Sequence, residues 1–261
     1  MSFLKKKSYG QHFLHERQVI ERIVDLVDDI NLVVEIGPGE GALTRALQER
    51  YDQKGTQMML VEADRDLFSH LQEMFPGAEL IQGDAARVAF DQYVKIPWVC
   101  VGNLPYNAAA AIMTHVLQTS PRPRQCVFMI QREQAQRATA AAGDLSMLSL
   151  ALQLYGTVSQ KFHVARGAFV PPPKVESTVI EIRPFPEDNT HDNEGILTFA
   201  QHGFLHRRKQ LLPSLVRAGY EEQRLRQTFV QLQLEFTVRP QELTVDQWKK
   251  LYEFMHKTST N

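Results

Sequence analysis

Leu32-Val33-Val34-Glu35-Ile36-Gly37-Pro38-Gly39-Glu40-Gly41 joins an apolar strand pattern to three alternating glycines. Glycine lets the backbone turn sharply and lets a ligand approach the main chain closely. The spacing Gly-x-Gly-x-Gly differs from the dinucleotide fingerprint Gly-x-Gly-x-x-Gly. We interpret the stretch as a ligand-binding turn at the end of a buried strand. A turn that serves only tight packing is the competing interpretation.

Apolar strands and amphipathic helices alternate on both sides of this turn. Such alternation predicts a mostly parallel sheet with helices on both faces, which is an α/β fold. Two later segments, 152–162 and 175–183, are expected to add an antiparallel hairpin at one edge. Strands are predicted at 32–36, 58–62, 79–82, 98–101 and 126–130, and helices at 16–29, 41–50, 65–75 and 108–117.

A polar, proline-containing segment, 184–190, follows the last strand pattern and is typical of a linker. Beyond it, from 194 to 257, only helical patterns occur. The sequence therefore predicts two domains, an α/β domain over 1–188 and a helical domain over 189–261.

The composition limits the classes of protein that need considering. With 43% hydrophobic and 23% charged residues, the chain resembles a folded soluble protein. It has no apolar run long enough to span a membrane and no secretory signal pattern. Cys100 and Cys126 are too few for a disulfide framework and lie in apolar runs, so we interpret them as buried hydrophobic residues. We predict a cytoplasmic protein that binds neither a metal nor a membrane.

The charge distribution is more informative than the net charge of -1. Lys5, Lys6 and Lys7 form one basic cluster near the amino terminus, and 206–209 forms another. Two positive patches on a nearly neutral chain indicate a local contact with an anionic partner. Solvated surface charge is the alternative.

Carboxylates follow the next two predicted strands. Glu62 ends the second strand about 20 residues after the last glycine, a spacing at which an acidic residue can bind ribose hydroxyls. Asp84 and Ala85 follow the third strand, where we expect them to face an adenine ring. Ligands of open α/β sheets bind at the carboxyl ends of the strands, so this set predicts a nucleoside cofactor. NAD and S-adenosylmethionine both fit it.

The motif after the fourth strand, Gly102-Asn103-Leu104-Pro105-Tyr106-Asn107, resembles the Asn-x-Pro-Tyr element of amino-methyltransferases. The resemblance implies that the Asn103 side chain and the Leu104 carbonyl accept hydrogen bonds from the amino group that is methylated. These acceptors favour the positive charge that develops on the nitrogen. Tyr106 is implied to stack on the unstacked target base.

Three further motifs extend the resemblance over nearly the whole chain. These are Tyr9–Leu14, Gly167–Ser177 and Phe204–Gln210. In this order the motifs are similar to those of the small-subunit (16S) rRNA adenine dimethyltransferases, whose loss confers kasugamycin resistance. The resemblance implies a Rossmann-like S-adenosylmethionine-dependent methyltransferase domain followed by a small all-α domain that binds RNA.

The resemblance also assigns roles to single residues. It implies that Phe169 supplies a second aromatic face for the target base. Asn103 contributes to the cofactor site as well as to the chemistry. The implied cofactor site comprises His12, Leu14, Glu35, Gly37, Gly39, Gly41, Glu62, Asp84, Ala85 and Asn103, and the implied RNA contacts are Lys5, Lys6, Lys7, Arg207, Arg208 and Lys209.

The implied reaction is the transfer of four methyl groups to two adjacent adenines in the 3′-terminal hairpin loop of 16S rRNA. The implied partner is the 30S subunit or its precursor, and a monomeric enzyme is expected. His12 departs from the family pattern, which has Asn there, and the nearly neutral charge is unusual for an RNA-binding enzyme.

Four other functions remain to be weighed against this one. Macrolide-resistance methyltransferases of the large subunit share the glycine turn and Asn-x-Pro-Tyr, but the triple proline 171–173 and the basic start of the helical domain favour the small-subunit family. A DNA adenine methyltransferase normally has a larger recognition domain. A ribosome-assembly factor with secondary methylation and an NAD enzyme are the remaining alternatives.

Overall fold

The computed structural model describes residues 12–186 and 192–256, and its first unit is built on a seven-stranded sheet. The strand order is β4-β3-β2-β5-β6-β9-β7. The first five strands run parallel, whereas β9 pairs antiparallel with both β6 and β7. Their bounds are β2 Leu32–Ile36, β3 Gln57–Glu62, β4 Glu79–Gln82, β5 Trp98–Asn103, β6 Gln125–Gln131, β7 Gly156–Val164 and β9 Ser177–Pro184. The predicted α/β class and the late antiparallel pair are confirmed.

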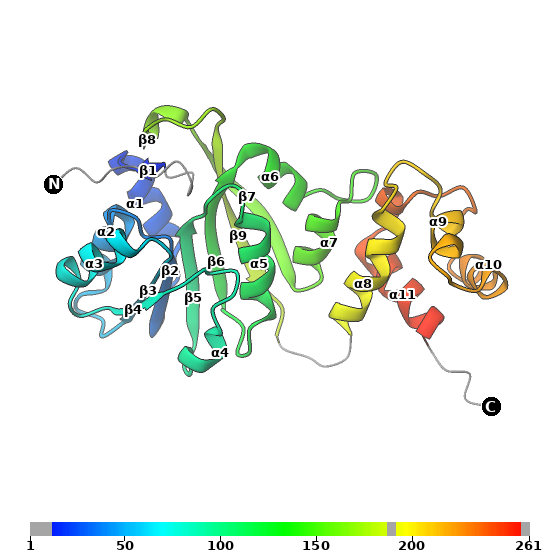
Figure 1. The fold of residues 1–261 in the computed structure, drawn as a ribbon, viewed down its shortest axis with the longest axis horizontal. Helices are drawn as coiled ribbons and strands as arrows, with labels where there is room; N and C mark the ends of the chain where they lie inside the picture. The colour runs from blue at the N-terminus through cyan, green and yellow to red at the C-terminus, as the bar shows by residue number, and fades with distance from the viewer. Residues whose placement is uncertain (1–11, 187–191, 257–261) are drawn as a thin grey trace. The chain divides into compact units, whose positions relative to one another are not determined.

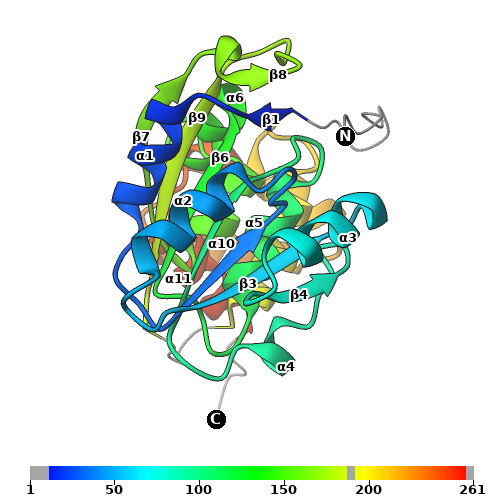
Figure 2. The same ribbon diagram turned by 90° about the vertical axis from the view of Figure 1, so that its left-hand side faces the viewer.

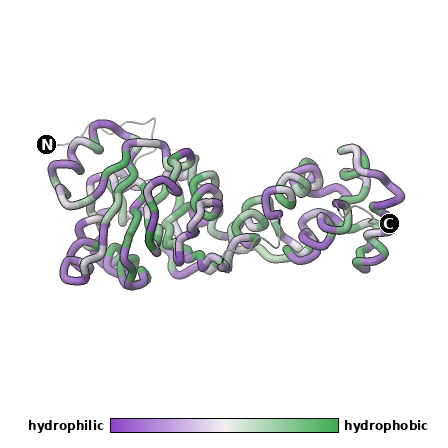
Figure 3. The backbone as a smooth tube through the Cα atoms, turned by 90° about the horizontal axis from the view of Figure 1, so that it is seen from below, coloured by the Kyte–Doolittle hydropathy of each residue, from purple (hydrophilic) through white to green (hydrophobic). Residues whose placement is uncertain are grey.

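Helices cover the sheet (Figures 1 and 2), and its central strands are mostly apolar and buried. All five residues of β2 are buried, as expected for a parallel strand covered on both faces. Figure 3 shows these hydrophobic stretches running through the middle of the unit. The helices are α1 Arg17–Leu26, α2 Ala42–Tyr51, α3 Arg65–Met74, α4 Phe90–Tyr93, α5 Ala109–Gln118 and α6 Arg132–Ala138.

One face of the sheet and helices α1 to α3 share a single hydrophobic core. From the helices, Ile23, Leu47 and Leu71 enter it, and Leu60 and Val101 enter from the strands. All five are at most 3% exposed, so the helices are fixed over the sheet by burial of apolar surface.

A small second sheet, which the sequence patterns do not predict, joins two distant segments. It pairs β1 (Phe13–Leu14) with β8 (Phe169–Val170) in antiparallel register. A short 3-10 turn, η2 (Arg166–Ala168), precedes β8. Each strand has only two residues, too few for a period-two pattern to stand out from the surrounding loop.

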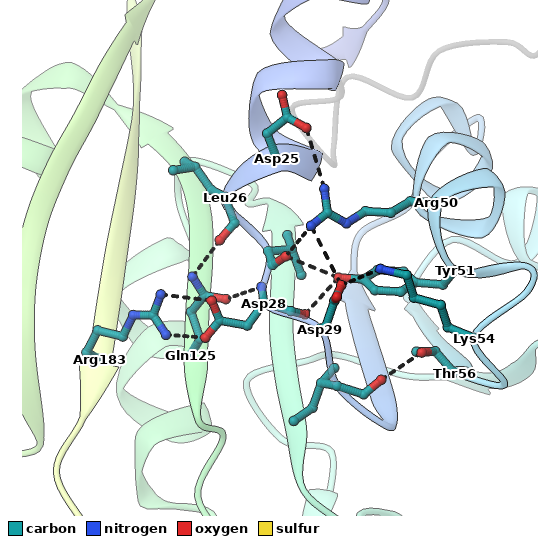
Figure 4. A network of polar contacts seen from close by, with 12 residues as sticks. Asp25, Leu26, Asp28, Asp29, Arg50, Tyr51, Lys54, Thr56, Gln125 and Arg183 are labelled. Atoms are coloured by element: carbon teal, nitrogen blue, oxygen red, sulfur yellow. Dashed lines mark hydrogen bonds and ion pairs between the residues drawn. The ribbon is translucent and has the colours of Figure 1, made fainter.

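A polar network lies at the end of β2 opposite to the glycine turn (Figure 4). Asp28, in the loop before β2, pairs with Arg183 of β9, and its backbone N–H donates to the Gln125 side chain at 2.9 Å. The neighbouring Asp29 pairs with Lys54 at 2.7 Å, beyond the end of α2. These contacts connect the α1–β2 loop to both sides of the sheet.

The second compact unit comprises residues 136–155 together with 188–261. Its described elements after 191 are helical, as predicted. Trp248 is fully buried at its centre, and Phe199 contacts Tyr220 edge-on at 4.9 Å. The elements are α7 Met147–Gln153, α8 Asn193–Phe204, α9 Leu211–Arg217, α10 Glu222–Gln231, the 3-10 turn η3 Pro240–Glu242 and α11 Val245–His256.

This division differs from the predicted one in the segment 136–155, which the prediction assigned to the first domain. The segment packs with the C-terminal helices because its main chain bonds to them. The Gln241 carbonyl accepts from the N–H groups of Gly143 (2.9 Å) and Leu145 (3.2 Å). The Asn193 side chain donates to the carbonyl of Leu154 at 3.4 Å.

Among the described residues, none of the helices has the length and apolar character needed to cross a membrane.

Candidate active site

A cavity of about 750 Å³ opens at the carboxyl ends of β2 to β5. Parallel α/β sheets bind ligands at this edge, where the strand ends converge. Phe13, Pro38, Ala63, Arg65, Gln82, Pro105 and Ile112 also line it and were not predicted as site residues. The predicted residues that line it are His12, Leu14, Glu35, Gly37, Gly39, Glu62, Asp84, Ala85, Asn103, Leu104 and Tyr106. Gly41 and Phe169 do not.

The glycine turn has the backbone conformation that its sequence predicts. Gly37, Gly39 and Gly41 all have positive φ, at 65°, 59° and 77°. A side chain at Gly41 would meet the Phe75 ring at 2.5 Å, which explains a glycine here although it does not line the cavity. A side chain at Gly39 would meet the Phe13 ring at 2.9 Å. The turn therefore lines the cavity through Gly37 and Gly39 and also packs against Phe13 of β1.

Gly39→Ala is expected to weaken cofactor binding at least tenfold. The new methyl group would strain a positive-φ backbone and push Phe13 away from the turn. Titration calorimetry with S-adenosylmethionine measures the change. Gly55→Ala, at φ 68° but with nothing within 4 Å of the added carbon, is the matched control and should retain wild-type affinity. Equal loss in both variants would show that strain alone is responsible.

Glu62 is buried between the glycine turn and the start of α3. Its two carboxylate oxygens accept from the backbone N–H groups of Gly39 at 3.3 Å and Asp64 at 2.9 Å. Burial raises the pKa of Glu62, and these two N–H groups act in the opposite direction. Each carboxylate oxygen has a second lone pair, so Glu62 can still accept a ligand hydroxyl.

Glu35 lies one residue before the end of β2 and is only 2% exposed. The Thr44 hydroxyl donates to it at 2.6 Å. Burial raises the pKa of Glu35 to about 8, and the nearby Glu62 adds to the shift. The cavity thus contains a carboxyl group whose charged form a cationic ligand would stabilise.

Asp84 and Ala85 lie in the loop after β4. The Asp84 carboxylate accepts from the backbone N–H of Ala86 at 3.0 Å and forms a longer ion pair with Arg87 at 3.8 Å. These contacts hold the loop so that Asp84 and the buried Ala85 both line the cavity. Glu35 of β2 and Glu62 of β3 supply carboxyl groups, and Ala85 supplies an apolar surface. Together they suit a nucleoside ligand that carries a cationic group.

The Asn103 side chain, at the end of β5, has a defined orientation. Its Nδ2 donates to the backbone carbonyl of His12 at 3.0 Å. A carbonyl can only accept, so the nitrogen must face β1 and Oδ1 remains as an acceptor. Within the described parts of the chain, Oδ1 has no hydrogen-bond partner.

Tyr106 is fixed from three sides. Its hydroxyl lies 2.9 Å from the buried Ser177 hydroxyl, and its carbonyl accepts from Gln134 Nε2 at 2.8 Å. Its ring stacks against His12 with centroids 5.8 Å apart and planes at 29°. Burial raises the pKa of Tyr106, so the phenol stays protonated at neutral pH. Tyr106 therefore presents a rigid, neutral ring to the cavity.

The structure does not bring Phe169 to the cavity. Leu14 pairs with Phe169 and Phe13 with Val170, an arrangement in which Phe169 is 2% exposed and Val170 is 45% exposed. Phe169 belongs to the hydrophobic core instead. The predicted stacking on a target base is not supported by this position.

The predicted RNA-binding residues differ in their surroundings. Lys5, Lys6 and Lys7 lie outside the described residues. Arg207 donates to the Asp144 carbonyl at 3.0 Å, within the helical unit, and its side chain is 38% exposed. Arg208 and Lys209 are exposed in the same loop. Arg207 thus contributes to folding, and its two neighbours are accessible.

The chain matches known families over most of its length. A family model described as "Ribosomal RNA adenine dimethylase" matches residues 2–257. A protein of Maridesulfovibrio salexigens named "Ribosomal RNA small subunit methyltransferase A" is 35% identical over 256 residues, 95% of this chain and 94% of that protein. A protein of the same name from Bordetella pertussis is 38% identical over 214 residues, 79% of each chain.

Solved structures with the same fold include two enzymes named for rRNA or adenosine methylation. The 23S rRNA methyltransferase ErmE is 25% identical, with a TM-score of 0.71 over 94% of this chain and all of that one. A dimethyladenosine transferase from Plasmodium falciparum is 21% identical, with a TM-score of 0.75 over 92% of this chain and 96% of that one. The second likeness concerns the fold alone.

Proposed function

This chain belongs to the ribosomal RNA adenine dimethylase family, and we propose that it methylates the N6 amino groups of two adjacent adenines in the 3′-terminal hairpin loop of 16S rRNA. Each adenine receives two methyl groups and becomes N6,N6-dimethyladenosine. The observation that carries the proposal is the orientation of Asn103, whose Nδ2 donates to the His12 carbonyl and whose Oδ1, without a partner among the described residues, remains as an acceptor at the cavity.

The methyl donor of the family is S-adenosylmethionine, and the cavity fits it. Glu62 suits the ribose hydroxyls, and Asp84 with Ala85 suits the adenine ring. Glu35, whose carboxyl group is buried and has a raised pKa, suits the cationic amino acid portion. When bound, this cofactor supplies a methyl group activated by a positively charged sulfur.

Asn103, Leu104 and Tyr106 act on the target base. The adenine amino group is a weak nucleophile because its lone pair is delocalised into the ring. Asn103 Oδ1 and the Leu104 carbonyl accept its two hydrogens, which favours a nitrogen with a localised lone pair and stabilises the developing positive charge. Tyr106 holds the base by stacking. We assign no side chain as a general base.

The two domains have different proposed roles. The α/β domain holds the cofactor and the reacting base, and the helical domain contacts RNA of the 30S particle or its precursor. We also propose a monomer, and the substrate implies a cytoplasmic location. The large exposed hydrophobic residues of the described chain come from separate segments of the sequence: Tyr93, Val170, Val175, Phe185, Leu205, Val230 and Phe236.

The fold does not discriminate between rRNA targets, because ErmE shares it over the whole of its chain. The small-subunit target is favoured by the higher identity to proteins named for that activity. Incubation of the enzyme and labelled S-adenosylmethionine with 30S particles from a kasugamycin-resistant strain and, in parallel, with 23S rRNA tests the choice. N6,N6-dimethyladenosine in the 3′-terminal hairpin is the expected product. Label that enters only 23S rRNA would move the target to the large subunit.

Replacing both Arg208 and Lys209 with alanine is expected to weaken RNA binding uniformly and to reduce its salt dependence. Each lost phosphate contact lowers the slope of log K against log salt by about one. Binding measured between about 50 and 200 mM salt gives this slope. Arg207→Ala is the contrasting variant. Because Arg207 donates a hydrogen bond to the Asp144 carbonyl, the Arg207→Ala substitution should lower the stability of the helical unit. An unchanged salt slope in the double variant would exclude Arg208 and Lys209 from the RNA interface.

A further inference from the structure

The Glu35 carboxyl group has one hydrogen-bond partner in the described part of the chain, and that partner is Thr44. The Thr44 hydroxyl donates to Glu35 Oε2 at 2.6 Å, and the two residues are 1% and 2% exposed, respectively. A hydroxyl that donates to a carboxylate forms a short, charge-assisted hydrogen bond. Glu35 lines the cofactor cavity, whereas Thr44 does not. Thr44 therefore acts on a ligand of the cavity through Glu35.

Thr44 meets Glu35 because of the position at which α2 begins. Gly41 precedes the helix in a left-handed conformation, and Ala42 is the first helical residue. Leu43 of this helix enters the core that α2 shares with the sheet, and the adjacent Thr44 is buried as well. The glycine turn thus brings a hydroxyl of the first turn of α2 to the next-to-last residue of β2.

The surroundings of Glu35 contain little to neutralise its charge. It forms no ion pair within residues 12–186 and 192–256, and its neighbours in register on β3 and β5, Leu60 and Val101, are apolar. Burial raises the pKa of Glu35 to about 8, the Thr44 hydroxyl acts in the opposite direction, and Glu62 adds to the rise. The other titratable residues that line the cavity are His12, Glu40, Arg65, Asp84 and Tyr106.

We propose that Thr44 is a positioning residue for the cofactor: its hydroxyl orients the ionised form of Glu35 toward the ammonium group of S-adenosylmethionine, and Glu35 releases its proton when the cofactor binds. This inference rests on the proposed methyltransferase function. The proton leaves the Glu35 oxygen for the solvent, and the remaining carboxylate pairs with the ammonium group. Because Thr44 holds Oε2, Oε1 is available to the ligand.

Binding of S-adenosylhomocysteine tests the proton release without turnover, because this reaction product keeps the ammonium group and lacks the transferred methyl group. Titration calorimetry at pH 7 in two buffers that differ in ionisation enthalpy counts the protons released. Wild type should release about one proton per ligand, since a group with a pKa of about 8 is mostly protonated in the free protein at that pH. Glu35→Gln should release almost none. Equal proton release in the two proteins would overturn the inference.

Thr44→Val keeps the shape of the side chain and removes the hydroxyl. Loss of a hydrogen bond to a charged group should weaken S-adenosylhomocysteine binding at pH 7 by about 10- to 100-fold. The rise of affinity with pH should also move to a higher pH than in wild type, because Glu35 has lost a donor that favours its ionised form. Thr44→Ser restores the hydroxyl and should restore both the affinity and the pH profile.

Thr56→Val is the matched control. Thr56 also donates a hydrogen bond, to the Ile30 carbonyl at 2.7 Å, and it does not line the cofactor cavity. Its replacement should leave the affinity and its pH dependence unchanged. An unshifted pH profile in Thr44→Val, or no rescue by Thr44→Ser, would overturn the positioning role. Thr44→Ala gives the same comparison if Thr44→Val does not fold. Failure of wild type to bind S-adenosylhomocysteine would instead refute the proposed function.

Discussion

Asn103→Ala is expected to lower kcat for methyl transfer by about 10²- to 10³-fold, the usual loss when a group aimed at developing charge is removed. The variant lacks the Oδ1 acceptor, so the amino nitrogen keeps its planar, delocalised form. Cofactor affinity should fall by no more than about tenfold, because only one neutral hydrogen bond is lost. Single-turnover transfer at saturating S-adenosylmethionine, paired with calorimetry, separates the two effects.

Asn103→Asp is the control for orientation. The carboxylate still offers an acceptor, but it cannot donate to the His12 carbonyl as Nδ2 does at 3.0 Å. We expect activity below wild type and weaker closure of the segment that carries His12. An Asn103→Ala enzyme with normal turnover would refute the assigned role. Rescue of subunit maturation by Asn103→Ala would show that an assembly role is separable from methylation.

Glu35→Gln is expected to stabilise the cofactor-free protein at pH 8 and to have little effect at pH 5. Burial raises the pKa of Glu35 from 4.5 to about 8. Between these values the folded state holds a proton that the unfolded state releases. Stability is therefore fully present below pH 4.5 and is lost as pH rises toward 8, by up to about 1.4 kcal/mol per pH unit. Gln cannot ionise, so the variant should be more stable at pH 8 by a few kcal/mol.

Urea unfolding between pH 5 and 8.5 measures this difference. Glu49→Gln removes an exposed carboxylate on α2 and serves as the matched control. Added S-adenosylmethionine should narrow the difference at pH 8, since a hydrogen bond to a charged group contributes about 1.5–3 kcal/mol and the variant loses that charge. If the free energy of unfolding changes with pH in the same way in wild type and Glu35→Gln, the pKa of Glu35 is not raised by folding and its carboxyl group is ionised in the folded protein.

The sequence predicts the parts of the site that depend on strand ends. Glu35, Glu62 and Asn103 could be placed together because parallel strands bring their carboxyl ends to one edge. Phe169 could not be placed, because its side chain direction depends on the register of a two-residue strand pair. A motif match identifies the residue but not the face to which it points.

The helical unit shows the same limit for packing between distant segments. Residues 136–155 lie between two strands in sequence, and only the bonds to Gln241 and Asn193 show that they pack with the later helices. Arg207 matched a basic motif, but its partner Asp144 lies in this same segment. Local patterns carry no information about such pairs.

The hydrogen bond between Asn103 and the carbonyl of His12 has a consequence for comparing sequences across the family. Every amino acid carries a backbone carbonyl, so the contact persists whichever side chain evolves at position 12. Statistical coupling between positions 12 and 103 should accordingly be weak, although the two residues touch. A contact map inferred from covariation would therefore omit the hydrogen bond that orients the Asn103 side chain.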